Sequence, residues 1–224
     1  MPFYEQLTDA TKEARTELLA APIIADCLQG RVTRDSYLAF LGQAFHHVRH
    51  TTPLLMNLGG RLPERQAWMR KAVAEYIDEE IGHEEWILND IAAAGGDAEM
   101  VRASQPDLPA EVMVAYAYDL INRRNPAGFF GMVFVLEGTS VALALTAADK
   151  IQQALGLPDK AFSYLRSHGT LDQEHTQHLA RLLDKMTADD QAEVFHCARV
   201  FFKLYGDVFR ALPTATPKGA ASCN

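Results

Sequence analysis

The segment His168–His175, with the sequence HGTLDQEH, carries three side chains that commonly bind metals. His168, Asp172 and His175 are spaced i, i+4 and i+7, so a helix would hold them within roughly 60° of each other on one face. Two imidazoles and one carboxylate on one stripe suit a divalent metal such as iron or manganese. A half-buried polar face is the competing interpretation, and this motif by itself does not decide between the two.

A second cluster of metal-binding residue types lies earlier in the chain. Glu80 and His83 have the Glu-x-x-His spacing that helical di-iron carboxylate proteins use. Gly82 between them would let another helix approach closely. Glu79 lies near the same face, so either glutamate is a candidate ligand. The segment is rich in acids, and a solvated helix face is the alternative interpretation.

Glu137 is an isolated carboxylate inside a strongly apolar segment. A buried carboxylate is costly unless it is paired, protonated or bound to a cation. No Lys or Arg occurs between Pro126 and Asp149, so a salt bridge would need a partner from another helix. Metal ligation is therefore the favoured interpretation.

Together these features give three carboxylates and three imidazoles from three expected helices, an inventory that suits two metal ions with open positions. Zinc sites more often use cysteine, and calcium avoids histidine. Two iron ions per chain are preferred, because mixed nitrogen and oxygen ligation with vacant positions supports O₂ chemistry. The predicted ligands are Glu80, His83, Glu137, His168, Asp172 and His175.

A His-rich stretch offers further candidates near this site. His47 and His50 share one helical face with Gln43 and are expected either to add a ligand or to line a substrate pocket. Hydrogen bonding between helices is an equally good explanation of these histidines.

Composition limits the function classes that remain open. The 224-residue chain is long enough for one domain with a substantial core. Its net charge of -8, with no basic block longer than Arg123-Arg124, argues against a nucleic-acid surface. We see no secretory signal and no uninterrupted apolar run of membrane-spanning length, and the three cysteines are widely separated. The expected protein is therefore cytoplasmic and acts on neither nucleic acid nor membranes.

Helical patterns cover almost the whole chain, and none of the sequence favours strands. We expect one all-α domain over residues 1–212, followed by a disordered tail over 213–224. The central segment is apolar almost all round and should form the buried centre of a bundle. The expected helices run over about 2–19, 33–60, 63–95, 109–125, 126–155, 158–185 and 187–212, with a short turn near 23–28. Thr33 and Thr187 are the expected N-caps of two of them.

Three segments of the chain resemble the heme-oxygenase-like superfamily, which also includes the TenA/thiaminase II and PQQ-synthase families. They are LTDATKEARTELL, GRVTRDSYLAFLGQAFHHV and FVLEGTSVALAL, and the resemblance extends over nearly the whole domain. It implies a single-domain heme-oxygenase-like, or TenA-like, multi-helix bundle.

The residues depart from two activities of this superfamily. True heme oxygenases bind haem through a histidine on the first helix, but the matching position here looks to be Arg15, and no histidine precedes His46. TenA-type thiaminases use a cysteine on the central helix, where this chain has Glu137 in about that region. The resemblance therefore implies neither haem degradation nor well-supported thiaminase chemistry.

The chain is most similar to the heme-oxygenase-like di-iron oxidases and oxygenases. Members share a Glu and a His on one helix, a central Glu, and a His-x3-Asp-x2-His run, which the segment His168–His175 and Glu137 match. Some members separate the first Glu and His by six residues. This chain has Tyr76 at that place, which leaves Glu80 or Glu79 to serve.

We therefore expect an O₂-dependent non-haem di-iron oxidase or oxygenase that acts on a small organic molecule. Phe130, Phe134 and Leu136 would exclude water from the site. A reductase or ferredoxin would supply electrons unless the substrate does so, and a homodimer is the ordinary assembly for such bundles. The alternatives are a metal-independent TenA-like hydrolase or heterocycle-binding protein on the same fold, and a non-catalytic helical interaction protein.

Overall fold

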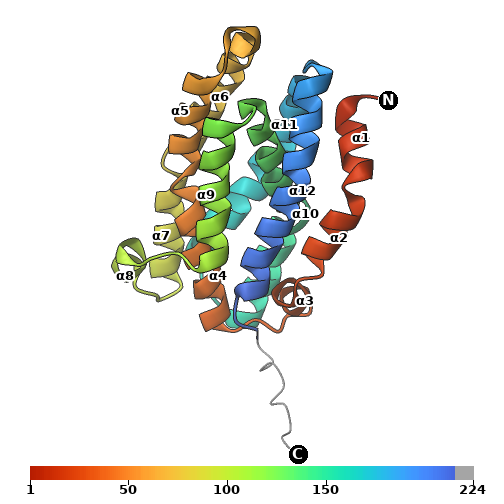
Figure 1. Ribbon diagram of the computed structural model, residues 1–224. Helices are drawn as coiled ribbons and strands as arrows, with labels where there is room; N and C mark the ends of the chain where they lie inside the picture. The colour runs from red at the N-terminus through yellow and green to blue at the C-terminus, as the bar shows by residue number, and fades with distance from the viewer. Residues whose placement is uncertain (215–224) are drawn as a thin grey trace, which may run out of the picture.

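The computed structural model describes residues 1–214, except for the side chains of residues 168–174, and within this range it contains helices and no strand. The predicted all-α bundle is confirmed (Figure 1). The helices are α1 (Phe3–Ala10), α2 (Lys12–Leu19), α3 (Pro22–Leu28), α4 (Arg34–Val48), α5 (Thr51–Arg61), η1 (Glu64–Met69), α6 (Arg70–Glu80), α7 (His83–Ala93), α8 (Ala98–Ala103), α9 (Leu108–Arg123), η2 (Pro126–Gly128), α10 (Phe129–Leu155), η3 (Asp159–Ala161), α11 (Ser163–Asp184) and α12 (Ala188–Ala211).

Three of the helices expected from the sequence are each broken into two or more helices. The first breaks at Thr11 and the second at His50. Pro53 explains the second break, because a proline in the first turn of α5 cannot donate a backbone hydrogen bond to the preceding helix. The third breaks at Gly82, whose φ of 90° is left-handed and favours glycine. The turn expected near residues 23–28 is the short helix α3, and α8 was not expected at all.

Helix α10 forms the centre of the bundle and packs most extensively against α11 and α12. The contact with α12 is close at Gly131, where an added Cβ would lie only 2.7 Å from the backbone of Val194 and Ala198. Within the described residues, the segment 126–155 alone is long and apolar enough to cross a membrane by length and composition. This segment is not an uninterrupted apolar run, because Glu137 lies within it. Half of its most apolar window is buried in the bundle, as a core helix would be.

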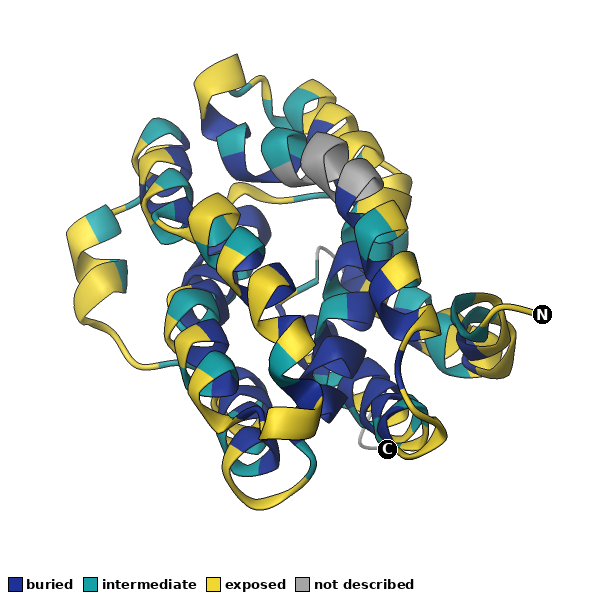
Figure 2. Cartoon of the chain, turned by 90° about the horizontal axis from the view of Figure 1, so that it is seen from above, coloured by how far each residue is buried: buried dark blue, intermediate teal, exposed yellow. Residues whose placement is uncertain are grey.

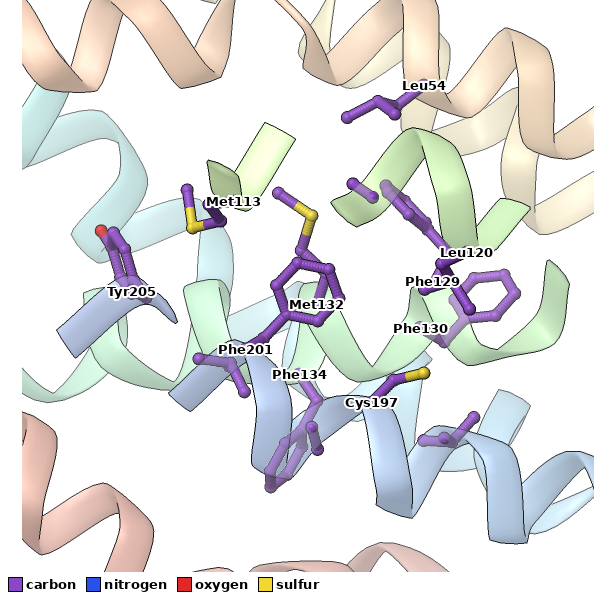
Figure 3. Close-up of a cluster of buried hydrophobic side chains, with 14 of the residues drawn as sticks. Leu54, Met113, Leu120, Phe129, Phe130, Met132, Phe134, Cys197, Phe201 and Tyr205 are labelled. Atoms are coloured by element: carbon purple, nitrogen blue, oxygen red, sulfur yellow. The ribbon is translucent and has the colours of Figure 1, made fainter. Parts of the chain in front are cut away.

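The buried faces of the helices meet in the interior, and the exposed residues lie on the outside (Figure 2). In the larger of two hydrophobic clusters, α5, α9, α10 and α12 contribute interlocking aliphatic and aromatic side chains (Figure 3). Phe130 and Phe201 are fully buried there. Burial of this apolar surface is the main favourable contribution to folding.

A buried carboxylate fixes the start of α12. Thr187 caps the helix as the sequence predicts, since its Oγ1 accepts a hydrogen bond from the Asp190 backbone N–H. The Asp190 carboxylate in turn accepts hydrogen bonds from Arg65, Gln66 and Asn125. Burial works to raise the pKa of Asp190, but these hydrogen bonds and that of Thr187 outweigh it and lower the pKa below its usual range.

Candidate metal centre

Glu137 lies in the middle of α10 with only 9% of its surface exposed. Its Oε1 is 3.8 Å from Nδ1 of His175, which lies on α11 and is 8% exposed. The predicted central carboxylate and one predicted histidine are thus brought together by the two most closely packed helices of the bundle.

Tyr76 lies at the centre of this group of residues. Its ring packs edge-on against His175, with the centroids 5.8 Å apart. Burial raises the pKa of Tyr76, and the nearby charge of Glu137, followed by those of Glu79 and Glu80, raises it further. The phenol is therefore protonated at neutral pH beside three carboxylates.

Sequence reasoning named Tyr76 only as the place where some relatives carry a carboxylate. Its position on α6, three and four residues before Glu79 and Glu80, was the signal that could have placed it here, because residues at that spacing share a helix face.

Glu80 and His83 also meet, although not in the way the sequence suggested. His83 Nδ1 is 3.0 Å from Glu80 Oε2, and the His83 ring stacks on Trp86. The two residues belong to different helices, because α6 ends at Glu80 and α7 begins at His83. Among the described residues no other helix approaches Gly82 closely, so the role expected for it finds no support there. An added Cβ there would meet open space, and Gly82 instead provides the left-handed turn between α6 and α7.

The two candidate glutamates of α6 differ in their surroundings. The Glu80 side chain is 13% exposed and lines an internal cavity together with Glu137. The Glu79 side chain is 47% exposed and places Oε2 3.0 Å from Nε2 of His175. Glu80 is therefore the better placed as a buried ligand, and Glu79 pairs with His175 from the outer side.

The cavity beside Glu80 and Glu137 encloses about 90 Å³. Leu136 contributes to its wall as expected, but Phe130 and Phe134 do not and belong to the hydrophobic core instead. The cavity is lined by His47, Val48, Thr51, Leu54, Leu55, Tyr76, Glu80, Phe129, Met132, Val133, Leu136, Glu137, Ser140, Tyr164 and Tyr205.

The two candidate histidines around the α4–α5 break have different positions. His47 lines the cavity, and its Nδ1 lies 3.0 Å from the carbonyl oxygen of Gln43. His50 does not line it, and its Nδ1 instead lies 3.2 Å from the Tyr118 hydroxyl on α9. Burial, followed by the charge of Arg49, lowers the pKa of His50. Only His47 therefore faces the site.

Two predicted ligands, His168 and Asp172, fall outside the residues whose side chains the structure describes. They belong to α11, whose helix spans Ser163–Asp184. Among the described side chains, no three His, Cys, Asp or Glu groups are arranged to hold a metal ion. The four described candidates form two pairs instead, Glu80 with His83 and Glu137 with His175. Their chemistry, imidazole and carboxylate without thiolate, fits iron.

The start of α11 is fixed from outside by Asp90 of α7, which is fully buried. Its carboxylate accepts hydrogen bonds from the backbone N–H groups of Ser163 and Tyr164, at 3.0 and 2.9 Å, and from the Ser163 hydroxyl. This arrangement caps the helix that carries His175, so it positions that helix against α7. Burial raises the pKa of Asp90.

Comparison with known proteins agrees with the donor set. Residues 38–206 match the model of a family described as iron-containing redox enzymes. The chain belongs to this family. The match extends from α4 to α12 and so includes every candidate ligand. No curated protein matches the sequence of this family member.

Solved structures similar to this iron-containing redox enzyme family member share its fold. A Shewanella denitrificans domain of unknown function with a heme-oxygenase-like fold is 21% identical, with a TM-score of 0.84 over 93% of this chain and 90% of that one. A TenA homologue from Pseudomonas syringae is 12% identical, with a TM-score of 0.76 over 93% and 91%. Heme oxygenase from Leptospira interrogans is 14% identical, with a TM-score of 0.73 over 95% and 100%. The fold is therefore heme-oxygenase-like.

Proposed function

We propose that this family member is a non-haem di-iron oxidase or oxygenase that uses O₂ to oxidise a small organic molecule. The observation that carries the proposal is the position of Glu137, a buried carboxylate on the central helix that faces His175 and shares a cavity with Glu80. The family match to iron-containing redox enzymes supports the same chemistry.

The residues that would hold the two irons are Glu80, His83, Glu137, His168, Asp172 and His175. Bound iron would supply the activation of O₂ that mixed nitrogen and oxygen ligands with vacant positions allow. The carboxylates would balance the charge of the cations, and the histidines would bind as neutral donors. Residues that contact metal ligands without binding the metal often orient those ligands. Tyr76 is placed to orient Glu137, and Glu79 is placed to orient His175.

Around the ligands, the chain provides a largely apolar chamber with one polar side. Leu54, Phe129 and Leu136 exclude water from the cavity, which strengthens electrostatic interactions inside it. His47 lies on the cavity wall and would orient the substrate or carry a proton. Electrons would come from a reductase or ferredoxin partner, or from the substrate itself, and the working assembly would be a homodimer.

The first test is the iron content of the purified protein. After anaerobic expression with added iron, we expect close to two irons per chain by elemental analysis, and far less in the His168→Ala, Asp172→Ala double variant. His196→Ala is the control, because His196 is exposed on α12, a helix that carries none of the predicted ligands. This control should keep its iron.

Two outcomes would contradict the proposal. Wild-type protein that holds no more iron than the double variant would show that these residues do not form the site. Metal-free protein that cleaves a thiamine-type substrate would favour the TenA-like hydrolase instead; two TenA homologues are among the structures that share this fold.

A further inference from the structure

A second cavity, of about 100 Å³, lies next to the one that contains Glu80 and Glu137. Its surface is almost wholly apolar, and none of its lining residues, all within the described part of the chain, is acidic, basic or a histidine. They are Ile23, Ile24, Cys27, Leu28, Val32, Ser36, Tyr37, Phe40, Thr139, Ser140, Leu143, Ala144, Ala147, Ile151, Tyr164, Leu165, Tyr205 and Phe209.

Several of the polar groups on this wall already have hydrogen-bond partners within the protein. The Tyr37 hydroxyl donates to the carbonyl oxygen of Ala161, and the Thr139 hydroxyl donates to that of Val135. Burial raises the pKa of the Cys27 thiol to about 11, so this thiol is neutral. A charged ligand group would find no counter-charge on this wall, and its desolvation would be costly.

The two cavities adjoin end to end along α10. The charged cavity uses α10 residues from Phe129 to Ser140, and the apolar one uses residues from Thr139 to Ile151. Thr139 and Ile151 lie twelve residues apart, about 18 Å along the helix, so the wall of the apolar cavity extends along the axis of α10. At its far end the cavity reaches Leu28, the last residue of α3.

Ser140 marks the junction, since it lines both cavities. Its Oγ is buried and has no hydrogen-bond partner among the described residues. Leaving a buried hydroxyl without a partner costs free energy, and a ligand that supplies one removes that cost. Ser140 also lies one helical turn from Glu137, so a polar group bound there would lie beside the candidate metal centre.

We propose that the apolar cavity binds the uncharged aliphatic chain of a substrate whose single polar end hydrogen-bonds to Ser140. The chain lies along α10 and places the carbons next to its polar end toward Glu137. That the polar end of this substrate is the end that reacts rests on the proposed function. The binding itself requires no metal, so it is tested separately.

The test uses octanol as the probe, with metal-free protein and isothermal titration. We expect saturable binding of octanol. The diol with hydroxyls at both ends of the same chain should bind at least about tenfold more weakly, because its second hydroxyl would be buried without a partner. Ser140→Ala should weaken octanol binding about two- to tenfold through loss of one hydrogen bond.

Two further variants test the position of the chain. Ala147→Phe fills the cavity and should weaken octanol binding at least tenfold. Ala142→Phe is the matched control on the exposed face of the same helix and should bind as the wild type does. Thermal unfolding reports whether each variant folds. If Ala147→Phe does not fold, Ala144→Leu fills the cavity with a smaller side chain and replaces it in the test.

Equal binding of octanol and the diol would overturn the proposal, as would an Ala147→Phe or Ala144→Leu protein that folds and binds octanol normally. Failure of wild-type protein to bind octanol would also overturn it. Iron content measured on the same preparations distinguishes the proposed function from the proposed binding of an aliphatic chain. A protein that holds two irons and binds no octanol contradicts only the second.

Discussion

At the scale of single residues, the candidate centre depends on groups that hold the ligands as well as on the ligands. Tyr76 illustrates this, because its protonated phenol lies beside Glu137 while its ring packs on His175. A neighbouring phenol stabilises a buried carboxylate in the metal-free protein, and it keeps the carboxylate oriented once a cation has bound.

Replacing Tyr76 by Phe should therefore leave the fold unchanged but weaken the binding of iron. Outer hydrogen-bonding partners of metal ligands are commonly worth about 10- to 100-fold in metal affinity, and we expect an increase of that order in the Kd for Fe(II). A competition titration with a chromophoric chelator measures it. Tyr116→Phe is the control, because Tyr116 is a half-buried tyrosine whose hydroxyl contacts Cys197 instead of the site. An equal loss of affinity in both variants would contradict the role given to Tyr76.

The same residue shows how far the sequence could predict the site. Glu137 was predictable because a lone carboxylate in an apolar helix is an anomaly visible in one segment. The approach of Tyr76 to Glu137 was not, since it depends on how α6 packs against α10, and no local pattern records that geometry. The choice between Glu79 and Glu80 has the same origin: the two are adjacent in sequence, and only their different exposure separates them.

At the scale of helices, periodicity predicted which segments are helical but not where they break. Gly82 and Pro53 were both visible in the sequence. Each is compatible with a continuous helix at a modest cost or with a break, and tertiary packing decides between these outcomes. Capping was more predictable, because the Thr33 and Thr187 caps depend only on residues within one turn, and both are confirmed.

Asp190 connects several elements, and its titration should be visible in the stability of the fold. A carboxylate whose pKa is lowered in the folded state stabilises the protein fully above its unfolded pKa, and this contribution is lost as the pH falls through the lowered folded value. We expect Asp190→Asn to reduce the free energy of unfolding by roughly 1–3 kcal/mol at neutral pH, toward the lower end because Arg65 is half exposed.

The difference between the wild type and Asp190→Asn should shrink as the pH falls from about 4, the pKa of an aspartate in the unfolded chain, through the lower pKa of Asp190 in the folded protein. Urea denaturation at neutral pH and in acid measures both values. Asp189→Asn is the matched control in the same first turn of α12, where the side chain is exposed, and it should change stability little. A difference between wild type and Asp190→Asn that persists unchanged in acid would show that the charge of Asp190 is not its cause.

At the scale of the whole molecule, the proposed centre joins helices that are distant in sequence. Glu80 ends α6, His83 begins α7, Glu137 lies in the middle of α10, and His175 lies on α11. Cations held by all four helices would bind the folded chain and not the unfolded one, so metal binding and folding should be thermodynamically linked.

Adding Fe(II) under anaerobic conditions should therefore raise the midpoint of thermal unfolding. Free metal at 100 times its Kd stabilises the folded state by about 2.7 kcal/mol, and for a domain of this size each kcal/mol corresponds to about 2–4 °C. We expect a rise of roughly 5–10 °C, measured by calorimetry at several iron concentrations. The His168→Ala, Asp172→Ala variant should show little rise, whereas His196→Ala should match the wild type. A rise of the same size in all three proteins would indicate that iron binds elsewhere on the surface.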